Sequence, residues 1–311
     1  MKLVINIPCY NEEGTLPLVL KEIPKKIKGI DKIIVQVVDD GSSDNTSKVA
    51  KRLGCEVVRH KRNRGLGMAF KTGVTHALEN GCDVFVNTDA DNQYPSKYIP
   101  RLVKPVLNGK SDLVIGNREP WKVPYFGVVK KFFQWLGNLS ARTVAGVKVP
   151  DTVSGFRAYS KEALLKLHVT TKFSYVLDTL VQASDKGLKI SNVKIKTNPP
   201  TRKSRLFNNI FEHMYKSGMN LLRLYALYKP FKTFFLLSLI FALPGALLIT
   251  RFFYFYIQDL GEGYIQSLII ASILMVMAGI TFALGVIGEL QRHNRQLMEE
   301  ELYMTKKERY V

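Results

Sequence analysis

Residues 84–95 read VFVNTDADNQYP, and this stretch decides how the chain folds. Its first part, 84–88, is rich in β-branched residues, the composition of a strand. The run passes directly into Asp89-Ala90-Asp91, followed by Asn92 and Gln93. Two carboxylates separated by one small residue at a strand end can hold a divalent ion. Such oxygen ligands suit Mg²⁺ or Mn²⁺, with a neutral oxygen from Gln93 as an addition. A solvated acidic turn is the alternative interpretation.

Short apolar runs alternate with helical stretches on both sides of that strand. Strands are predicted at 3–7, 32–38, 56–58, 84–88 and 113–116, and helices at 15–28, 45–53, 67–80 and 95–107. This order predicts an α/β fold, a mostly parallel sheet with helices on both faces. Ligands of such sheets gather at the carboxyl ends of the strands, so polar residues at those ends are the candidate site.

Polar residues also follow the first and second predicted strands. The first strand leads into Pro8-Cys9-Tyr10-Asn11-Glu12-Glu13. A proline, an aromatic ring, an amide and two acids at a strand exit could bracket a base and a ribose, although Asn-Glu-Glu is also good helix-capping chemistry.

The second strand ends in the run 38–46, which reads VDDGSSDNT. An Asp-Gly turn and a helix cap explain Asp44 and Thr46. They do not explain two acids directly after an apolar strand. Asp39 and Asp40 are therefore predicted to hydrogen-bond a base or a ribose.

Composition limits the kind of protein. A chain of 311 residues can form one large domain and a smaller appendage, and 45 Lys and Arg against 26 Asp and Glu give a net charge of +19. That charge predicts an anionic partner: nucleic acid, lipid headgroups or phosphorylated small molecules. The three cysteines, Cys9, Cys55 and Cys82, form neither a disulfide framework nor a metal site, and they suit a reducing compartment.

Two uncharged stretches near the C-terminus predict membrane spans. The stretch 233–250 has eighteen residues and 263–288 has twenty-six, and a helix needs roughly 20 apolar residues to cross the bilayer core. The first stretch reaches that length if it extends through the aromatic residues 252–257, and Pro244 predicts a kink in it. A pair of buried core helices is the alternative.

The charges beside these stretches predict the orientation. Seven Lys or Arg lie in 201–232 and one in 251–262, so the large domain and both termini are expected on the cytoplasmic side. The spacing of apolar residues in 206–228 predicts a helix, lying in the membrane interface or packed on the soluble domain. The expected organisation is a cytosolic domain at 1–205, an interfacial region at 206–232, two transmembrane helices in 233–288 and a cytosolic helical tail at 289–311.

With these motifs in view, the chain resembles the family 2 glycosyltransferases with the nucleotide-sugar-binding A-type fold. It is most similar to the polyprenyl-phosphate glycosyltransferases, which include the dolichyl-phosphate mannose synthases. The stretches that carry the resemblance are 7–13, 38–46, 89–95 and 151–157, in the family's order. The paired spans favour the lipid-phosphate branch, and Cys9 replaces the Ser or Thr common in the first motif.

The resemblance implies roles for particular residues. It places the nucleotide-sugar at Pro8, Tyr10, Asn11, Glu12, Asp39, Asp40, Gly41, Arg64, Gly67, Asp89, Ala90 and Asp91. It implies that Asp89, Asp91 and Gln93 hold Mg²⁺ or Mn²⁺ on the diphosphate, and that Arg118, Arg202 and Lys203 match basic positions near the phosphates. Two anionic substrates repel each other, and the basic residues Arg118, Lys131, Arg202, Lys203 and Arg205 are expected to offset that repulsion. The catalytic set is expected to be Asp89, Asp91, Arg118 and Arg202. Asp151 and Asp178 stay open: they could orient sugar hydroxyls, or cap 154–157 and pair with Lys172.

The implied activity is metal-dependent, inverting transfer of a sugar to dolichyl or polyprenyl phosphate. GDP-mannose is the first expected donor, with UDP-glucose and UDP-N-acetylglucosamine close behind. A lipid phosphate has a second pKa of about 6, as in phosphoserine, so it is largely dianionic and needs no general base. A different lipid acceptor and a catalytically silent nucleotide-binding membrane anchor are the alternatives.

Nucleic acid and a second copy of the chain are two further candidate partners. No zinc-finger spacing or aromatic RNA-binding signature supports nucleic-acid binding, and the basic cluster lies beside a predicted span. Small residues such as Ala242 and Ala246 permit helix association, including a homo-oligomer, without specifying one.

Overall fold

The computed structural model describes most of the chain in two units. The described residues are 1–119, 135, 137–139, 141–143, 145–169, 175–199, 218–219, 223, 225–258 and 265–310. The first unit comprises Met1–Leu221 with Leu302–Val311, and the second comprises Leu222–Glu301. Most of the helix predicted at 206–228 lies outside the described residues.

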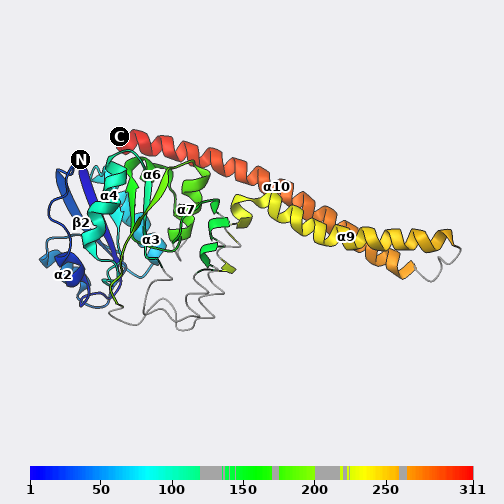
Figure 1. Cartoon of the computed structure of the whole chain (residues 1–311), viewed down its shortest axis with the longest axis horizontal. Helices are drawn as coiled ribbons and strands as arrows, with labels where there is room; N and C mark the ends of the chain where they lie inside the picture. Colours follow the sequence, from blue (N-terminus) through cyan, green and yellow to red (C-terminus); the bar gives the residue numbers. More distant parts are fainter. Residues whose placement is uncertain are drawn as a thin grey trace. The chain divides into compact units, whose positions relative to one another are not determined.

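A mixed, mostly parallel sheet forms the centre of the first unit (Figure 1). Within the described residues it has seven strands in the order β3-β2-β1-β4-β6-β5-β7. The strands are β1 Lys2–Cys9, β2 Lys32–Asp39, β3 Glu56–Arg59, β4 Val84–Asn87, β5 Leu113–Asn117, β6 Arg157–Ser160 and β7 Ile190–Lys194. Only β6 runs antiparallel to its neighbours, β4 and β5. The predicted mostly parallel α/β sheet is therefore confirmed.

Helices connect most of these strands. They are α1 Leu16–Lys21, α2 Thr46–Arg52, α3 Leu66–Glu79, the 3₁₀ turn η1 Ser96–Tyr98, α4 Ile99–Leu107, α6 Lys161–Lys166 and α7 Tyr175–Asp185. Helix α1 is shorter than the predicted 15–28, because Pro24 disfavours helical backbone at Ile23 and lacks a donor of its own. The sequence analysis did not predict β6, α6, α7 or β7.

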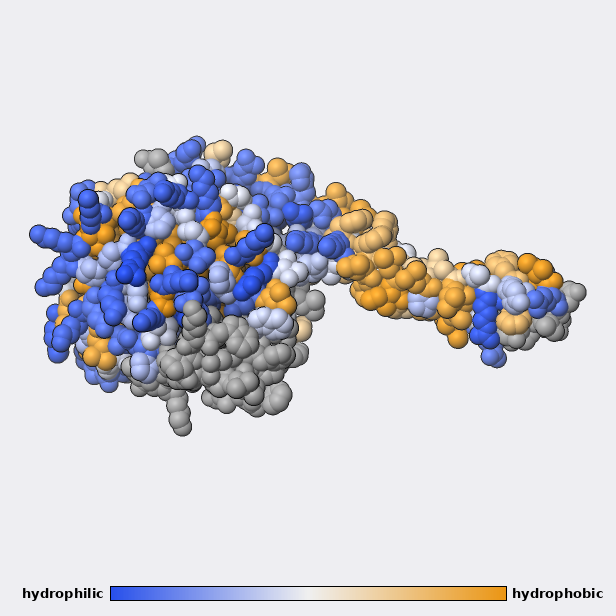
Figure 2. All heavy atoms as spheres, in the orientation of Figure 1, coloured by the Kyte–Doolittle hydropathy of each residue, from blue (hydrophilic) through white to orange (hydrophobic). Residues whose placement is uncertain are grey.

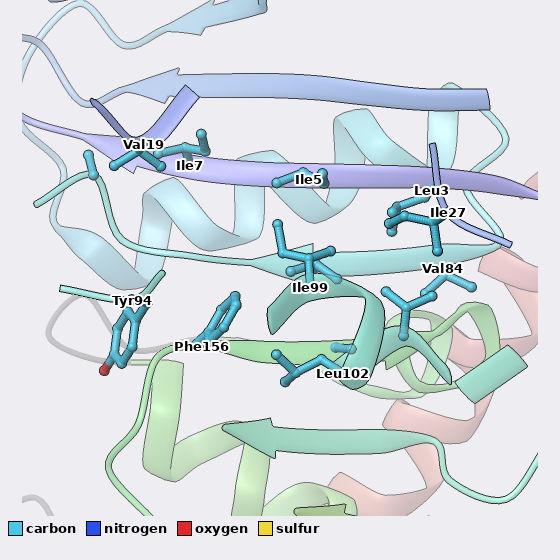
Figure 3. Close-up of a cluster of buried hydrophobic side chains, with 14 of the residues drawn as sticks. Leu3, Ile5, Ile7, Val19, Ile27, Val84, Tyr94, Ile99, Leu102 and Phe156 are labelled. Carbon is cyan, nitrogen blue, oxygen red and sulfur yellow. The ribbon is translucent and has the colours of Figure 1, made fainter. Parts of the chain in front are cut away.

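The hydrophobic core lies between one face of the sheet and α4. Strand side chains alternate between faces, and Leu3, Ile5 and Ile7 of β1 form one fully buried cluster with Ile99 and Leu102 of α4. Figure 3 shows this cluster extending to Tyr94 and Phe156. The core therefore ends close to the acidic turn that follows β4. Helix α3 packs on the other face, against β1 and β2.

Two long helices follow the sheet domain, α9 Pro230–Ile257 and α10 Ile265–Tyr310. By length and composition both could span a membrane, and Figure 2 shows apolar side chains over much of their surface. Helix α9 continues through Pro244. Helix α10 continues through the predicted tail, and its last turns, from Leu302, belong to the first unit.

Candidate functional site

The loops with polar motifs meet at one edge of the sheet. Strands β1, β2 and β4 are parallel neighbours, so the residues that follow them emerge on the same side. Strand β6 runs the opposite way, and its first residue, Arg157, lies opposite Asn87, the last residue of β4. The segment 151–156 therefore reaches the same edge.

The loops after β1 and β2 are joined by hydrogen bonds through Asn11. Its side-chain oxygen accepts from the backbone N–H of Ser43 at 2.8 Å, and its own N–H donates to the Ser42 hydroxyl at 2.9 Å. The backbone N–H of Glu12 donates to the Thr46 hydroxyl at 2.8 Å. Asn11 adopts φ 57°, a left-handed conformation that asparagine tolerates. The neighbouring Tyr10 ring is 42 % exposed and offers a surface for stacking.

Asp39 lies fully buried beneath the second loop. Its carboxylate accepts from the backbone N–H of Ser42 at 2.8 Å and from the Ser47 hydroxyl. Gly41 has φ 77°, and a Cβ built there would stand 2.6 Å from the Arg62 carbonyl carbon, so only glycine fits. These contacts show how Asp39 shapes its loop, and its predicted contact with a nucleoside stays a prediction.

Asp40 anchors the loop that follows β3. One carboxylate oxygen contacts His60 Nδ1 at 2.6 Å and accepts from Arg64 N–H at 2.9 Å, and the other accepts from Gly65 N–H at 2.8 Å. His60 Nε2 lies 2.9 Å from the Thr72 hydroxyl of α3. The sequence analysis missed His60, and its one signal was a histidine two residues after a predicted strand. Of the other predicted nucleotide residues, Pro8 in β1 and Gly67 in α3 are both buried.

The acidic turn lies beside Gly155. Asp91 accepts from the backbone N–H of Gln93 at 3.0 Å, and Ala90 is buried. A Cβ built on Gly155 would stand 3.2 and 3.3 Å from the two carboxylate oxygens of Asp89. A side chain at this position would therefore crowd the Asp89 carboxylate.

This turn fits a divalent cation better than a structural metal centre. Among the described residues, no three His, Cys, Asp or Glu side chains are grouped to hold a metal ion. The donors that the turn offers are the hard oxygens of Asp89 and Asp91, with the amide oxygen of Gln93. Two carboxylates with space beside them suit Mg²⁺ or Mn²⁺, which complete their coordination with waters and substrate phosphates.

Asn198 connects a second segment to the acidic turn. Its side-chain amide donates to the Asn92 carbonyl at 2.9 Å, and its backbone N–H donates to the Gln93 carbonyl at 3.0 Å. The chain reaches Arg202 four residues later. Four of the predicted basic residues lie outside the described part of the chain: Lys131, Arg202, Lys203 and Arg205.

Arg118 forms a buried, two-pronged ion pair with Asp151. Its Nε and Nη2 lie 2.7 and 2.9 Å from the two carboxylate oxygens, and Asp151 is fully buried. Burial alone lowers the pKa of Arg118, but Tyr94, Asp151 and Asp89 outweigh it and raise that pKa above its ordinary value. The structure thus gives Asp151, left open by the sequence, a partner. Asp178, also left open, accepts from the Gln182 amide at 2.9 Å.

The sequence analysis also missed the residues that hold the segment 151–155. The guanidinium of the fully buried Arg157 donates to the carbonyls of Thr152 and Ser154, each at 2.8 Å, and to that of Val176 at 2.7 Å. These bonds attach the segment to α7. No sequence signal marks such a role, because Arg157 lies beside its partners only after folding.

Comparisons with known proteins place the chain among glycosyltransferases. The chain matches the family model described as Glycosyl transferase family 2 over residues 4–167. It is 32 % identical over 217 residues to the UDP-N-acetylglucosamine–dolichyl-phosphate N-acetylglucosaminyltransferase of Methanococcus voltae, covering 61 % of this chain and 83 % of the relative. It is 31 % identical over 206 residues to the undecaprenyl-phosphate mannosyltransferase of Micrococcus luteus, covering 63 % of this chain and 83 % of the relative.

A solved structure has the same fold. It is the glucosyl-3-phosphoglycerate synthase of Mycobacterium tuberculosis in complex with Mn²⁺, uridine diphosphate and phosphoglyceric acid. It matches with a TM-score of 0.56 at 22 % identity, over 72 % of this chain and 77 % of that one.

Proposed function

The chain belongs to glycosyl transferase family 2, and from that premise we propose that it transfers a sugar from a nucleotide-sugar to a polyprenyl or dolichyl phosphate. The observation that carries the proposal is the acidic turn at Asp89 and Asp91, at the sheet edge where the loops of β1 and β2 meet. The two relatives named above support the acceptor, since both are named for transfer to a lipid phosphate.

GDP-mannose is the first donor we propose, with UDP-N-acetylglucosamine and UDP-glucose as close alternatives. The relatives' names divide between mannose and N-acetylglucosamine. Tyr10, with its exposed ring, would stack on the base. The hydrogen bonds that join the loops of β1 and β2 would hold this surface in place before the donor arrives, which lowers the ordering cost of binding.

Asp89, Asp91 and Gln93 would hold the divalent cation. When bound, Mg²⁺ or Mn²⁺ supplies positive charge against the charge that develops on the departing diphosphate. Arg118 would add a fixed positive charge nearby, oriented by Asp151. Arg202, Lys203 and Arg205 would carry positive charge toward the two anionic substrates, and Asn198 ties the start of their segment to the acidic turn. Because the acceptor is largely dianionic, this proposal assigns no general base and gives inversion at the anomeric carbon.

The two apolar helices would anchor the enzyme in the membrane that holds its acceptor. We place the catalytic domain and both termini on the cytoplasmic side, because positive charge is concentrated before α9. The net charge of +19 suits both an anionic membrane surface and anionic substrates.

The experiment uses purified full-length protein in detergent with a polyprenyl phosphate and Mg²⁺ or Mn²⁺. GDP-mannose, UDP-glucose and UDP-N-acetylglucosamine are offered separately, and glycosylated lipid and released nucleoside diphosphate are measured. We expect product with one donor. Nucleotide binding that depends on the metal, without product from any donor, would favour another donor or acceptor, or a catalytically silent protein.

Asp91→Ala is the matched variant for this assay. We expect it to abolish metal-dependent transfer while the circular dichroism spectrum stays that of the wild type, because the side chain lies half-buried in a turn outside the helices and strands. Turnover by this variant in the presence of a chelator would contradict the metal assignment.

A further inference from the structure

A row of amide side chains crosses the buried middle of the sheet. Gln36 of β2, Asn6 of β1 and Asn87 of β4 lie directly opposite one another in the strand register, and each is fully buried. Strands buried on both faces usually carry apolar residues. A buried amide without partners costs free energy, so this row needs an explanation.

The three amides form a chain of hydrogen bonds, here named the amide ladder. Gln36 Nε2 donates to Asn6 Oδ1 at 2.8 Å, and Asn6 Nδ2 donates to Asn87 Oδ1 at 2.7 Å. At one end His76 Nδ1 lies 3.0 Å from Gln36 Oε1. At the other end Asn87 Nδ2 donates to the Tyr175 hydroxyl at 2.6 Å. The ladder therefore spans three strands and ends on α7.

Tyr175 is held on its ring as well as on its hydroxyl. The ring stacks on Phe70 of α3, with centroids 4.0 Å apart and an interplanar angle of 1°. The residue is fully buried. A tyrosine with two such constraints has little rotational freedom, so its hydroxyl occupies one defined position.

That position lies next to the acidic turn. The Tyr175 hydroxyl donates to the Gly155 carbonyl at 3.0 Å, and the Gly155 N–H donates to the Tyr94 hydroxyl at 3.3 Å. A Cβ built on Gly155 would stand 3.1 Å from the Tyr175 hydroxyl and 3.2 Å from Asp89 Oδ1. The tyrosine hydroxyl and the Asp89 carboxylate therefore converge on the same side of Gly155.

A purely structural amide ladder would only bind α3 and α7 to the sheet. This ladder instead ends on the peptide group that packs against Asp89. Groups behind the ligands of a metal ion orient those ligands, and their loss lowers metal affinity without removing a ligand. The geometry therefore gives the ladder an effect on the site as well as on stability.

We propose that Tyr175 is a positioning residue for Asp89. The amide ladder holds the tyrosine hydroxyl, the hydroxyl holds the Gly155 peptide, and that peptide sets the position of the carboxylate that receives the donor's divalent cation. The inference rests on the proposed function for the statement that Asp89 binds this cation.

The test measures Mn²⁺ binding rather than turnover. Full-length wild type and variants in detergent are titrated with Mn²⁺ in the presence of saturating GDP or, separately, UDP, and free Mn²⁺ is followed by electron paramagnetic resonance. We expect Tyr175→Phe to raise the dissociation constant of Mn²⁺ about 10-fold. Nucleotide binding in the presence of a chelator is expected to be the same in Tyr175→Phe as in the wild type.

Tyr159→Phe is the matched control. Tyr159 on β6 is also fully buried and lies in the same aromatic cluster, 5.7 Å from Phe70 between ring centroids. Its substitution makes the same chemical change, the loss of one tyrosine hydroxyl, and we expect Mn²⁺ affinity like that of the wild type. The melting temperatures of both variants are measured as well. If the two hydroxyls contribute to stability alone, both melting temperatures fall while the Mn²⁺ affinities of the two variants remain equal.

Asn87→Ala provides a second test should Tyr175→Phe not fold. It removes the Asn87 bond to the Tyr175 hydroxyl and also the 3.4 Å bond from Asn87 Nδ2 to the Gly155 carbonyl. The tyrosine stays in place, and we expect weaker Mn²⁺ binding here too. Where both variants fold, the double variant should weaken Mn²⁺ binding by less than the product of the two single effects, because the two side chains bond each other and the same Gly155 carbonyl.

The outcomes distinguish the positioning role of Tyr175 from the assignment of the metal site. Equal Mn²⁺ affinity in wild type, Tyr175→Phe and Asn87→Ala would overturn the positioning role and leave the proposed function standing. A wild type that binds no Mn²⁺ with either nucleotide would overturn the metal assignment, and the positioning role with it.

Discussion

At the scale of single residues, the region around the site contains charged side chains that are buried in pairs and removed from water. Arg118 and Asp151 are such a pair: Asp151 is fully buried and the Arg118 side chain is 13 % exposed. The net contribution of a buried ion pair is small, because desolvation offsets its attraction. Removing one member is costly, since the other charge is left without compensation.

Asp151→Asn should therefore lower the free energy of unfolding by about 3 kcal/mol. Urea unfolding in detergent, followed by circular dichroism, measures this loss. The control is Asp31→Asn, because the Asp31 side chain is 88 % exposed where it pairs with the N-terminus, and exposed pairs contribute little. Equal losses in the two variants would show that the Arg118 pair does not stabilise the domain.

Gly73 of α3 tests how closely that helix packs on the amide ladder. A Cβ built there would stand 2.7 Å from Asn6 Cγ, and the Gly73 carbonyl accepts from Gln36 Nε2 at 2.7 Å. We expect Gly73→Ala to lower the free energy of unfolding by about 1–3 kcal/mol, because the added carbon overpacks a buried contact.

Gly14→Ala is the control for Gly73→Ala, since a Cβ at Gly14 would meet nothing within 4 Å. The same denaturation experiment serves both variants. A Gly73→Ala protein as stable as Gly14→Ala would mean that α3 can move away from the ladder at no cost.

At the scale of elements, the last turns of α10 pack on α6 within the first unit. The Tyr303 hydroxyl lies 3.0 and 3.2 Å from the two carboxylate oxygens of Glu162. Lys306 Nζ lies 3.0 Å from His168 Nδ1 and 3.5 Å from the carbonyls of Leu165 and Leu167. These carbonyls lie at the C-terminal end of α6, where backbone acceptors lack helical partners. Lys306 thus supplies donors to a helix end.

This contact should become more stable as the pH rises through the alkaline range. Burial, with the nearby charges of Lys186 and Lys71, lowers the pKa of Lys306 from 10.5 to about 8. The undocked segment then binds more protons than the docked one between those two values, so docking gains stability as pH increases across that window. The imidazole of His168 faces the same group, with its Nδ1 3.0 Å from Lys306 Nζ.

Hydrogen exchange of residues 302–310, corrected for the intrinsic rate, measures this effect at about pH 7 and about pH 9.5. Protection should increase at the higher pH in the wild type. In Lys306→Met the increase should disappear, because the titrating group is gone. An increase of equal size in both proteins would assign the effect to another group.

At the scale of the whole molecule, two kinds of membrane attachment have to be separated. The net charge of +19 could hold the chain to anionic headgroups, whereas α9 and α10 could hold it by insertion. Charge-mediated attachment is screened by salt, because the Debye length falls to about 3 Å at 1 M. Attachment by inserted apolar helices is not screened by salt.

We therefore expect the protein to stay with the membrane pellet after washing in about 1 M salt and after washing in alkaline carbonate. Immunoblots of pellet and supernatant measure this. Release by salt would indicate surface binding by the basic residues alone, and release by carbonate alone would indicate peripheral attachment.

Local signals were enough for much of the fold. Strands β1 to β5 follow apolar runs that end in polar residues, and their predicted positions agree with the structure to within two residues at each end. Helices α9 and α10 follow from uncharged stretches that need no tertiary contact to be recognised. The helix α1 was predicted too long, because the pattern of apolar residues outweighed the break at Pro24.

The sequence by itself determined the positions of the first five strands along the chain, the polar loops at the strand ends and the two long apolar helices, because periodicity and composition act over a few residues. Only the tertiary structure decided that β6 lies antiparallel between β4 and β5, that Asp40 contacts His60, and that Arg118 pairs with Asp151. It also decided that the amides of Asn6, Gln36 and Asn87 share one face and lead through Tyr175 to Gly155. These partners lie far apart along the chain. Burial selects them, because a polar group removed from water is stabilised only by the particular partner that folding brings within hydrogen-bonding distance.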